Sequence, residues 1–317
     1  MTWIASSAAD RRAQFGRFLL GTGGLGGIAG ATGPGIGLPE AEGLELIDRA
    51  VREGVKVLDT ADVYAGGESE RIVGVWNRGR PGSEVLIQTK TGITPDGPNL
   101  DPERVDRQLR HSIEVIGRVD LYVAHQVDGR TPWEKSLPVF SDAVERGTIR
   151  AYGLSNVDGA ALSAALETAD RLGLARPEIV QNQYSLLARA DDAEVLPIVE
   201  AEGLAYTPFS PLANGLLAGR YSNGERPQRG DRASVASSAA PFLDDDQAMA
   251  KVARFNGLAA ARDTSPAALA MAWLFHHPLV TAPIVGVSKE HHWAGILDGL
   301  ALDWNDELAA AVDEIFG

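Results

Sequence analysis

The chain has 317 residues, of which 44% are hydrophobic, as is typical of a globular protein that buries a large core. With 29 Lys and Arg against 43 Asp and Glu, its formal net charge is −14, so we expect no broad nucleic-acid-binding surface. The absence of cysteine excludes disulfides, thiolate zinc sites and cysteine nucleophiles, and we expect no metal site.

The beginning of the chain shows no sign of a targeting segment. Residues 1–12 lack the charged-then-apolar order of a secretory signal, and no later apolar run approaches the ~20 residues that a membrane-spanning helix needs. A chain without cysteine also suits a reducing compartment. We therefore expect a cytoplasmic protein without a membrane partner. The sequence does not specify its oligomeric state.

Strand-like runs rich in Val, Ile and Leu alternate with helical stretches, which is typical of a parallel sheet with crossover helices. Eight such runs lie at residues 17–20, 55–64, 85–90, 119–125, 149–154, 178–182, 204–209 and 282–286. In the second run, residues 55–64, only the first part has the apolar pattern of a strand. Eight units in a chain of this length predict an α/β protein with a (β/α)8 TIM barrel, whose typical size is about 250 residues. We expect a single barrel domain over residues 1–317.

Helical patterns with recognisable stop signals lie between the runs. Apolar residues recur at helical spacing over residues 44–51 and 105–116, and a glycine follows each segment. Two stretches depart from a bare barrel. Residues 305–316 predict an extra C-terminal helix, and the Gly-, Ser- and Arg-rich stretch 222–241 predicts a long rim loop with a role at the site.

The glycine-rich segment 21–27 contains the string G-x-G-x-x-G of dinucleotide-binding Rossmann folds. That motif requires a helix directly after it and an acidic residue about 20 residues further on. Here more glycines and the pair Gly33-Pro34 follow before a helix can start. We therefore interpret the segment as a flexible first loop on the barrel rim.

Four polar residues lie at or just beyond the ends of three consecutive strand-like runs. Asp59 and Tyr64 belong to the second run, Lys90 ends the third and His125 ends the fourth. The active site lies at the carboxyl ends of the strands in essentially every characterised barrel enzyme. A carboxylate, a phenol, an ammonium and an imidazole gathered there indicate proton-transfer chemistry.

Each residue of this set has an expected role. Tyr64 is the candidate proton donor, since a phenol with an ordinary pKa of about 10 holds its proton at neutral pH. An ammonium within about 4–6 Å favours the phenolate, and Lys90 on the next strand can supply it. Asp59 can keep Lys90 charged. His125 is expected to orient a carbonyl oxygen through one neutral ring nitrogen.

Each of the four also has an ordinary structural explanation when it is considered alone. Asp59 would then cap a helix, Tyr64 would be an interfacial aromatic, Lys90 a surface charge and His125 a hydrogen-bonded rim histidine. Their joint occurrence on neighbouring strands, in types that support one another, favours the functional interpretation of the set.

At these residues the chain resembles the aldo-keto reductases. Asp-Thr-Ala-Asp-Val-Tyr at 59–64, followed by Gly-Glu-Ser-Glu at 67–70, resembles the family's strand-two signature. Thr-Lys at 89–90 resembles its strand-three lysine, and residues 120–125 resemble its histidine segment. The resemblance implies that NADPH reduces an aldehyde, a ketone or an open-chain sugar, with the hydride passing from the nicotinamide and the proton from Tyr64.

The resemblance also implies cofactor contacts on the other strands. Residues 153–156 resemble the family's G-x-S-N string at the nicotinamide carboxamide, a task that the strand-six amide shares. Residues 209–212 resemble the aromatic-S-P-L string whose ring stacks on the nicotinamide. The expected cofactor contacts are Gly21, Thr22, Ser155, Asn156, Gln181, Phe209, Ser210, Leu212, Gly286, Ser288, Lys289 and His292.

The adenosine end departs from the family pattern. Residues 284–289 resemble the I-x-G-x-[ST]-x run in which a basic residue and a hydroxyl hold the 2′-phosphate. His-His-Trp-Ala-Gly-Ile at 291–296 stands where many relatives carry Arg or Gln and then Glu-Asn. Lys289 near a helix start still offers a charge for a phosphate. NADP is therefore the expected cofactor, and NAD is the alternative.

The substrate is set by variable loops. Trp133 could line the pocket, although a tryptophan at a helix start is as often part of the core. The series Arg220, Arg226, Arg229 and Arg232 could hold the cofactor pyrophosphate or an acidic substrate, although loop arginines are usually solvated.

Other functions compete with carbonyl reduction. A nucleotide-sensing regulatory subunit is one, because some reductase-like proteins resemble channel β-subunits, and an NADH-preferring sugar dehydrogenase is another. A barrel lyase or aldolase would use Lys90 as a Schiff-base amine. A glycosidase needs two opposed carboxylates, whereas the fourth and seventh runs offer His125 and Phe209.

Overall fold

The computed structural model describes residues 2–28, 32, 36–221 and 240–317. Eight strands form one parallel sheet in the order β7-β6-β5-β4-β3-β2-β1-β8. They are β1 (Leu19–Gly21), β2 (Val57–Asp59), β3 (Leu86–Thr91), β4 (Leu121–Ala124), β5 (Ala151–Ser155), β6 (Ile179–Gln181), β7 (Ala205–Tyr206) and β8 (Ile284–Val285). Each of the eight predicted runs overlaps one of these strands.

The sheet curls until its two edge strands meet. Thr281 N donates to Tyr206 O, and Ile284 N donates to Pro208 O, both at 2.8 Å, so backbone hydrogen bonds join the β7 side of the sheet to the β8 side. The Thr281 hydroxyl accepts a further bond from Tyr206 N at 3.1 Å. The predicted parallel (β/α)8 barrel is therefore confirmed.

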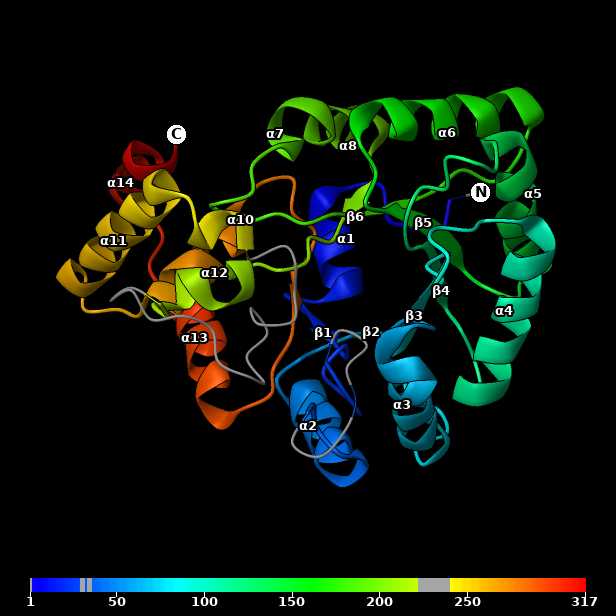
Figure 1. The fold of residues 1–317 in the computed structure, drawn as a ribbon, viewed down its shortest axis with the longest axis horizontal. Coiled ribbons are helices and arrows are strands. Elements are labelled where there is room, and N and C mark those ends of the chain that lie inside the picture. The colour runs from blue at the N-terminus through cyan, green and yellow to red at the C-terminus, as the bar shows by residue number, and fades with distance from the viewer. Residues whose placement is uncertain (1, 29–31, 33–35, 222–239) are drawn as a thin grey trace.

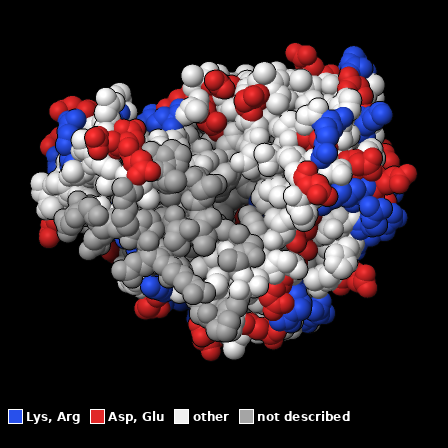
Figure 2. Space-filling model, viewed as in Figure 1, with Lys and Arg blue, Asp and Glu red and all other residues white. Residues whose placement is uncertain are grey.

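Helices surround the strands (Figure 1). They are α1 (Ala8–Phe15), α2 (Glu40–Arg52), the 3-10 helix η1 (Tyr64–Gly67), α3 (Glu68–Arg78), α4 (Pro102–Ile116), α5 (Trp133–Glu145), α6 (Gly159–Leu172), α7 (Asp191–Glu194), α8 (Leu196–Glu202), the 3-10 helix η2 (Ala213–Ala218), α10 (Ala240–Leu243), α11 (Asp246–Ala261), α12 (Pro266–His276), α13 (Glu290–Ala301) and α14 (Asp306–Phe316). The face of the molecule in Figure 2 is hollowed near its centre, and the charged side chains of the described residues on this face lie mainly around the margin.

The punctuation in the sequence sets the helix boundaries. In α4 the Asp101 carboxylate accepts from two backbone N–H groups of the first turn, and Pro102 occupies a position whose N–H would have no partner. Gly117 ends α4 with φ 100°, a left-handed conformation that favours glycine. The predicted C-terminal helix is α14, which Asn305 caps.

Helix α1 has no counterpart among the sequence predictions, because its residues are almost all small or polar. Its last residue, Phe15, is fully buried and packs with Ile4 against the first residue of each strand. This apolar floor comprises Ile4, Phe15, Leu19, Val57, Leu86, Leu121, Ala151, Ile179, Ala205, Ala282 and Ile284. Because this apolar floor fills the barrel at the amino ends of the strands, polar side chains can gather only at the carboxyl ends.

The glycine-rich segment is a loop, as predicted, except that its first residue, Gly21, ends β1. Leu25 is buried and bridges to Leu38, and the next helix after the segment is α2. Gly33-Pro34 and residues 222–239 of the predicted rim loop lie outside the described residues, and its end falls in α10. In the part of the chain that the structure describes, each helix is too short or too polar to cross a membrane.

Two glycine substitutions test the close packing of α3 against α4. A Cβ on Gly74 would press into the carbonyl oxygen of Val115, whereas a Cβ on the exposed Gly257 of α11 would meet no atom within 4 Å. We expect Gly74→Ala to lower the free energy of unfolding by about 1–3 kcal/mol through overpacking. Gly257→Ala should raise it by about 0.5–1 kcal/mol, because alanine favours a helix. Urea denaturation measures both, and equal effects would contradict the packing argument.

Candidate active site

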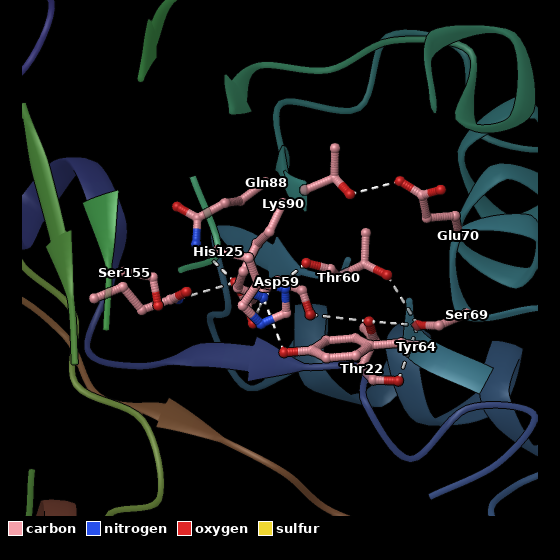
Figure 3. A network of polar contacts seen from close by, with 12 residues as sticks. Thr22, Asp59, Thr60, Tyr64, Ser69, Glu70, Gln88, Lys90, His125 and Ser155 are labelled. Carbon is pink, nitrogen blue, oxygen red and sulfur yellow. Dashed lines mark hydrogen bonds and ion pairs between the residues drawn. The ribbon is translucent and has the colours of Figure 1, made fainter. Parts of the chain in front are cut away.

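The carboxyl ends of three neighbouring strands bring the four predicted catalytic residues together (Figure 3). Asp59 is the last residue of β2, Lys90 lies in β3, His125 follows β4 directly, and Tyr64 begins η1. The set therefore comes from strands two, three and four of the barrel, as the sequence predicted.

The Lys90 ammonium is the centre of this group. Its Nζ donates to Asp59 Oδ2 at 2.8 Å, to the carbonyl oxygen of Thr60 at 2.7 Å and to Tyr64 Oη at 3.0 Å. These three bonds use all three protons of the ammonium. Because an ammonium cannot accept a hydrogen bond, the Tyr64 oxygen is the acceptor, and the phenolic proton remains available to another partner.

Lys90 is held in the charged form. Burial lowers the pKa of Lys90, but the neighbouring Asp59 and Tyr64 outweigh burial and leave the pKa raised. The side chains of Lys90 and Asp59 are only 2% and 4% exposed, so water screens this ion pair little. A Schiff-base mechanism requires a neutral lysine. The charged Lys90 therefore argues against the lyase or aldolase alternative.

Tyr64 stands at the start of a tight left-handed turn. The three residues that follow, Ala65, Gly66 and Gly67, have φ values of 51°, 65° and 94°. This conformation is strained for alanine and easy for glycine. The Tyr64 ring also faces Gly23, where a Cβ would lie 3.5 Å from the ring. The sequence did not indicate this turn, because an alanine in its first left-handed position gives no signal.

Buried hydroxyls hold the first rim loop to the Tyr64 segment. Thr22 Oγ1 donates to the Asp59 carbonyl at 2.9 Å, and Ser69 Oγ lies 2.8 Å from Thr22 Oγ1 and 2.9 Å from Thr60 Oγ1 (Figure 3). Gly21 and Thr22 were predicted as cofactor contacts. The structure gives the Thr22 side chain an internal role, and a cofactor contact of either residue stays a prediction.

His125 is held as a neutral imidazole. Burial, and then the charge of Lys90, lower the pKa of His125 well below its ordinary value. Its ring packs edge-on against Tyr64 with 5.7 Å between ring centroids, and Nδ1 is buried without a hydrogen-bond partner among the described residues. A neutral imidazole beside the phenol can donate to a carbonyl oxygen without charge, which is the role that the sequence predicted.

Three predicted nicotinamide contacts lie beside this centre. Ser155 ends β5, and Asn156 follows it in a left-handed conformation, with its Nδ2 donating to the His125 carbonyl at 2.8 Å and to Ser155 Oγ at 3.1 Å. Gln181 ends β6, and its Nε2 donates to Asp59 Oδ1 at 3.0 Å. Their contact with a nicotinamide stays a prediction.

The sequence analysis missed Gln88. This fully buried residue lies in β3 opposite Asp59, and its Nε2 donates to Asp59 Oδ1 at 2.7 Å. The alternation of a strand provided a signal, because residues two apart face the same side and Gln88 precedes Lys90 by two. A single glutamine in an apolar strand does not reveal which partner it has.

The predicted adenosine contacts gather at the start of α13. Gly286, Ser288 and Lys289 are exposed after β8, and Ser288 N donates to His292 Nδ1 at 3.2 Å. Burial, and then basic neighbours that include Arg220 and Lys289, lower the pKa of His292 to about 4. At neutral pH His292 therefore presents Nε2–H as a donor, and Lys289 supplies the positive charge.

The remaining candidates lie around the rim. Phe209, Ser210 and Leu212 follow β7, and Phe209 is partly buried against the apolar floor. Trp133 packs partly buried against the hydrophobic core at the start of α5, which favours the core interpretation.

The other arginines predicted at the rim provide no further candidate residues, and neither does a metal site among the described residues. Arg226, Arg229 and Arg232 lie outside the described residues. The described part of the chain contains no group of three His, Asp or Glu residues arranged to hold a metal ion.

A second buried carboxylate, that of Asp62, lies close to the turn that begins at Tyr64. Asp62 Oδ2 accepts from Thr91 Oγ1 at 3.0 Å and lies 3.6 Å from the Arg104 guanidinium, whereas the buried Oδ1 has no hydrogen-bond partner among the described residues. Burial is the main cause that raises the pKa of Asp62 to about 6, and the nearby Glu70 adds to it. The chain therefore keeps a poorly satisfied carboxylate two residues before Tyr64.

Replacing this carboxylate by an amide should stabilise the fold at neutral pH. The pKa of Asp62 rises from the ordinary value of 3.8 to about 6 on folding, so ionised Asp62 destabilises the fold above that pH, and the destabilisation fades as the pH falls toward the unfolded value. Asp62→Asn should raise the free energy of unfolding by roughly 1–3 kcal/mol at about pH 8, and by much less near pH 4. Urea denaturation at the two pH values measures the difference.

Asp128 provides a matched control for this measurement. Burial raises its pKa, but hydrogen bonds from Thr131, Leu100 N and Arg130 N reverse the shift and lower the pKa overall. Asp128→Asn should therefore lower the free energy of unfolding at about pH 8. A loss of stability at that pH in Asp62→Asn as well would contradict the description of Asp62.

The protonation state of His125 can be observed directly. Since burial and the charge of Lys90 lower its pKa well below the ordinary value of about 6.5, its ring should still be neutral near pH 6, where an ordinary histidine is largely protonated. Nitrogen NMR of histidine-labelled protein, with the resonance assigned by its loss in His125→Gln, should show one protonated and one bare ring nitrogen at that pH. An imidazolium spectrum near pH 6 would show that His125 is charged.

Comparisons with known proteins agree with this geometry. The family model of the aldo/keto reductase family matches residues 19–316. A probable aldo-keto reductase 1 of Glycine max is 30% identical over 260 residues, which cover 80% of this chain and 72% of that protein. A probable voltage-gated potassium channel subunit beta of Oryza sativa subsp. japonica is 32% identical over 264 residues, which cover 79% of each chain.

A solved structure has the same fold. The glycerol dehydrogenase of Gluconobacter oxydans aligns with a TM-score of 0.79 at 25% sequence identity, over 94% of this chain and 90% of that chain. The family match extends over all eight strands. With this fold and this match, the chain belongs to the aldo/keto reductase family of NAD(P)H-dependent oxidoreductases.

Proposed function

We propose that this protein reduces the carbonyl group of an aldehyde, a ketone or an open-chain sugar to the alcohol, with NADPH as the hydride donor. The observation that carries the proposal is the Lys90 ammonium held between the Asp59 carboxylate and the Tyr64 phenol at 2.8 Å and 3.0 Å. We also propose a cytoplasmic location, since a chain without cysteine suits a reducing compartment.

The residues divide the reaction among them. The carbonyl carbon would receive its hydride from a reduced nicotinamide when that cofactor is bound. His125 donates a hydrogen bond from its neutral ring to the carbonyl oxygen, and Tyr64 transfers its phenolic proton to that oxygen as negative charge develops there. The Tyr64 oxygen is left as a phenolate that Lys90 stabilises, and Asp59 keeps Lys90 charged.

The residues present fit a nicotinamide cofactor with a 2′-phosphate. Ser155, Asn156 and Gln181 surround the catalytic centre with side-chain donors and acceptors, and the buried Gln181 Oε1 has no partner among the described residues. Lys289 is the N-cap residue of α13, at the helix end where backbone N–H groups and the helix dipole favour an anion. These features support NADP over NAD, and binding titrations with the two cofactors test the preference.

A regulatory subunit is the second candidate, because a relative is named as a probable potassium channel subunit beta. Such a protein would bind NADPH tightly without turning it over on a broad panel of carbonyl compounds. The complete set of Tyr64, Lys90, Asp59 and His125 supports catalysis. An NADH-preferring sugar dehydrogenase is a further alternative, which oxidation assays with polyols and NAD would identify.

Removing one oxygen atom tests the assigned proton donor. Tyr64→Phe should lower turnover of NADPH with reactive aldehydes by about 100-fold or more, because general acid catalysis contributes about 10²–10⁴-fold. The dissociation constant of NADPH, measured by fluorescence titration, should change less than about twofold, because the phenol does not hold the cofactor in place. Turnover at the wild-type rate in Tyr64→Phe would exclude Tyr64 as the acid.

A further inference from the structure

Asp59 is surrounded by donors. Its Oδ1 accepts from Gln88 Nε2 at 2.7 Å and from Gln181 Nε2 at 3.0 Å, and its Oδ2 accepts from Lys90 Nζ at 2.8 Å. Amide nitrogens and an ammonium donate but cannot accept. A protonated Asp59 would direct its proton at one of these donors, so the arrangement accepts the carboxylate form alone.

The orientation of the two amides leaves their own carbonyl oxygens without hydrogen bonds. Gln88 Oε1 and Gln181 Oε1 are both buried without a hydrogen-bond partner among the described residues. A buried carbonyl oxygen without a donor destabilises a fold, and most buried polar atoms in proteins have a partner. Turning either amide would place its oxygen against the carboxylate. Donation to Asp59 therefore accounts for both orientations.

Gln88 has no other visible function. It is fully buried in β3, where it faces Asp59 across the strand pair and precedes Lys90 by two residues (Figure 3). Neither the sequence motifs nor the expected cofactor contacts include it. Gln181 was expected to serve the nicotinamide as well, so Gln88 is the residue through which the donors of Asp59 can be changed without changing an expected cofactor contact.

We propose that Gln88 is a positioning residue of the catalytic centre. Its amide N–H stabilises the Asp59 carboxylate and thereby strengthens the interaction of the Lys90 ammonium with the Tyr64 oxygen. This inference rests on the proposed carbonyl reduction. When two amide N–H groups donate to the Asp59 carboxylate, its negative charge is partly compensated and its ion pair with Lys90 is weaker. More of the positive charge then acts on the Tyr64 oxygen, which favours the phenolate that remains after proton transfer.

The test compares wild-type protein with Gln88→Met, which keeps a similar length and volume but has no N–H donor. At neutral pH we expect turnover with NADPH and a reactive aldehyde to fall about tenfold, since hydrogen bonds to charged groups are worth about that factor. The Michaelis constant for NADPH should change less than about twofold. Loss of turnover alone would also follow from a purely structural defect, so a second measurement is needed.

That second measurement needs no turnover. Ultraviolet absorbance reports phenolate formation, and the difference between each protein and its counterpart that also carries Tyr64→Phe isolates the signal of Tyr64. In Gln88→Met this signal should appear at a pH about half a unit or more above that of the wild type, because Lys90 supports the phenolate less. The alkaline limb of the pH profile of turnover should move in the same direction.

Thr207→Val is the matched control. Thr207 is also fully buried, its Oγ1 has no hydrogen-bond partner among the described residues, and it is not one of the residues that donate to the Asp59 carboxylate, which are Gln88, Gln181 and Lys90. We expect the Tyr64 signal to stay at its wild-type pH in this variant. Superimposable titrations of wild type and Gln88→Met would overturn the inference. A wild type that reduces no carbonyl would refute the proposed function instead, and the absorbance titration would still decide the role of Gln88.

Discussion

The buried ammonium of Lys90 is the interaction on which the active end of the barrel depends. A charge removed from water destabilises a protein unless it is paired and hydrogen-bonded. Here one side chain of β3 satisfies that requirement with three acceptors from β2 and the segment after it, namely Asp59, Thr60 and Tyr64. The same bonds that compensate the buried charge fix the phenol in place. Stability and the geometry of the candidate active site therefore share one set of contacts.

The sequence predicted the barrel and the four candidate catalytic residues for a physical reason. Buried parallel strands are continuous apolar runs, and polar residues at the ends of such runs stand out. Asp59, Lys90 and His125 could be recognised in this way, and family resemblance assigned their roles. Helix α1 was missed because its burial depends on Phe15 at its end, which periodicity does not reveal.

Side-chain partners were beyond the sequence. Gln181 and Asn156 were predicted as nicotinamide contacts, but which group each amide contacts in the protein depends on its orientation in three dimensions. In the structure Gln181 donates to Asp59 and Asn156 donates to the His125 carbonyl. Gln88 was overlooked for the same reason, because its hydrogen-bond partner, Asp59, lies on another strand. The left-handed turn after Tyr64 was likewise invisible, because Ala65 adopts a conformation that its own preference opposes.

The junction between β7 and β8 is closed by individual hydrogen bonds without a continuous strand register. Other neighbouring strands pair in regular registers, whereas this junction is bridged by the bonds of Thr281 and Ile284 to the residues around Tyr206. The loops that follow these two strands carry Phe209 on one side and Lys289 on the other. A ligand long enough to contact both loops would stabilise the closed junction. Occupancy of the site and the resistance of the barrel to opening would then be thermodynamically linked.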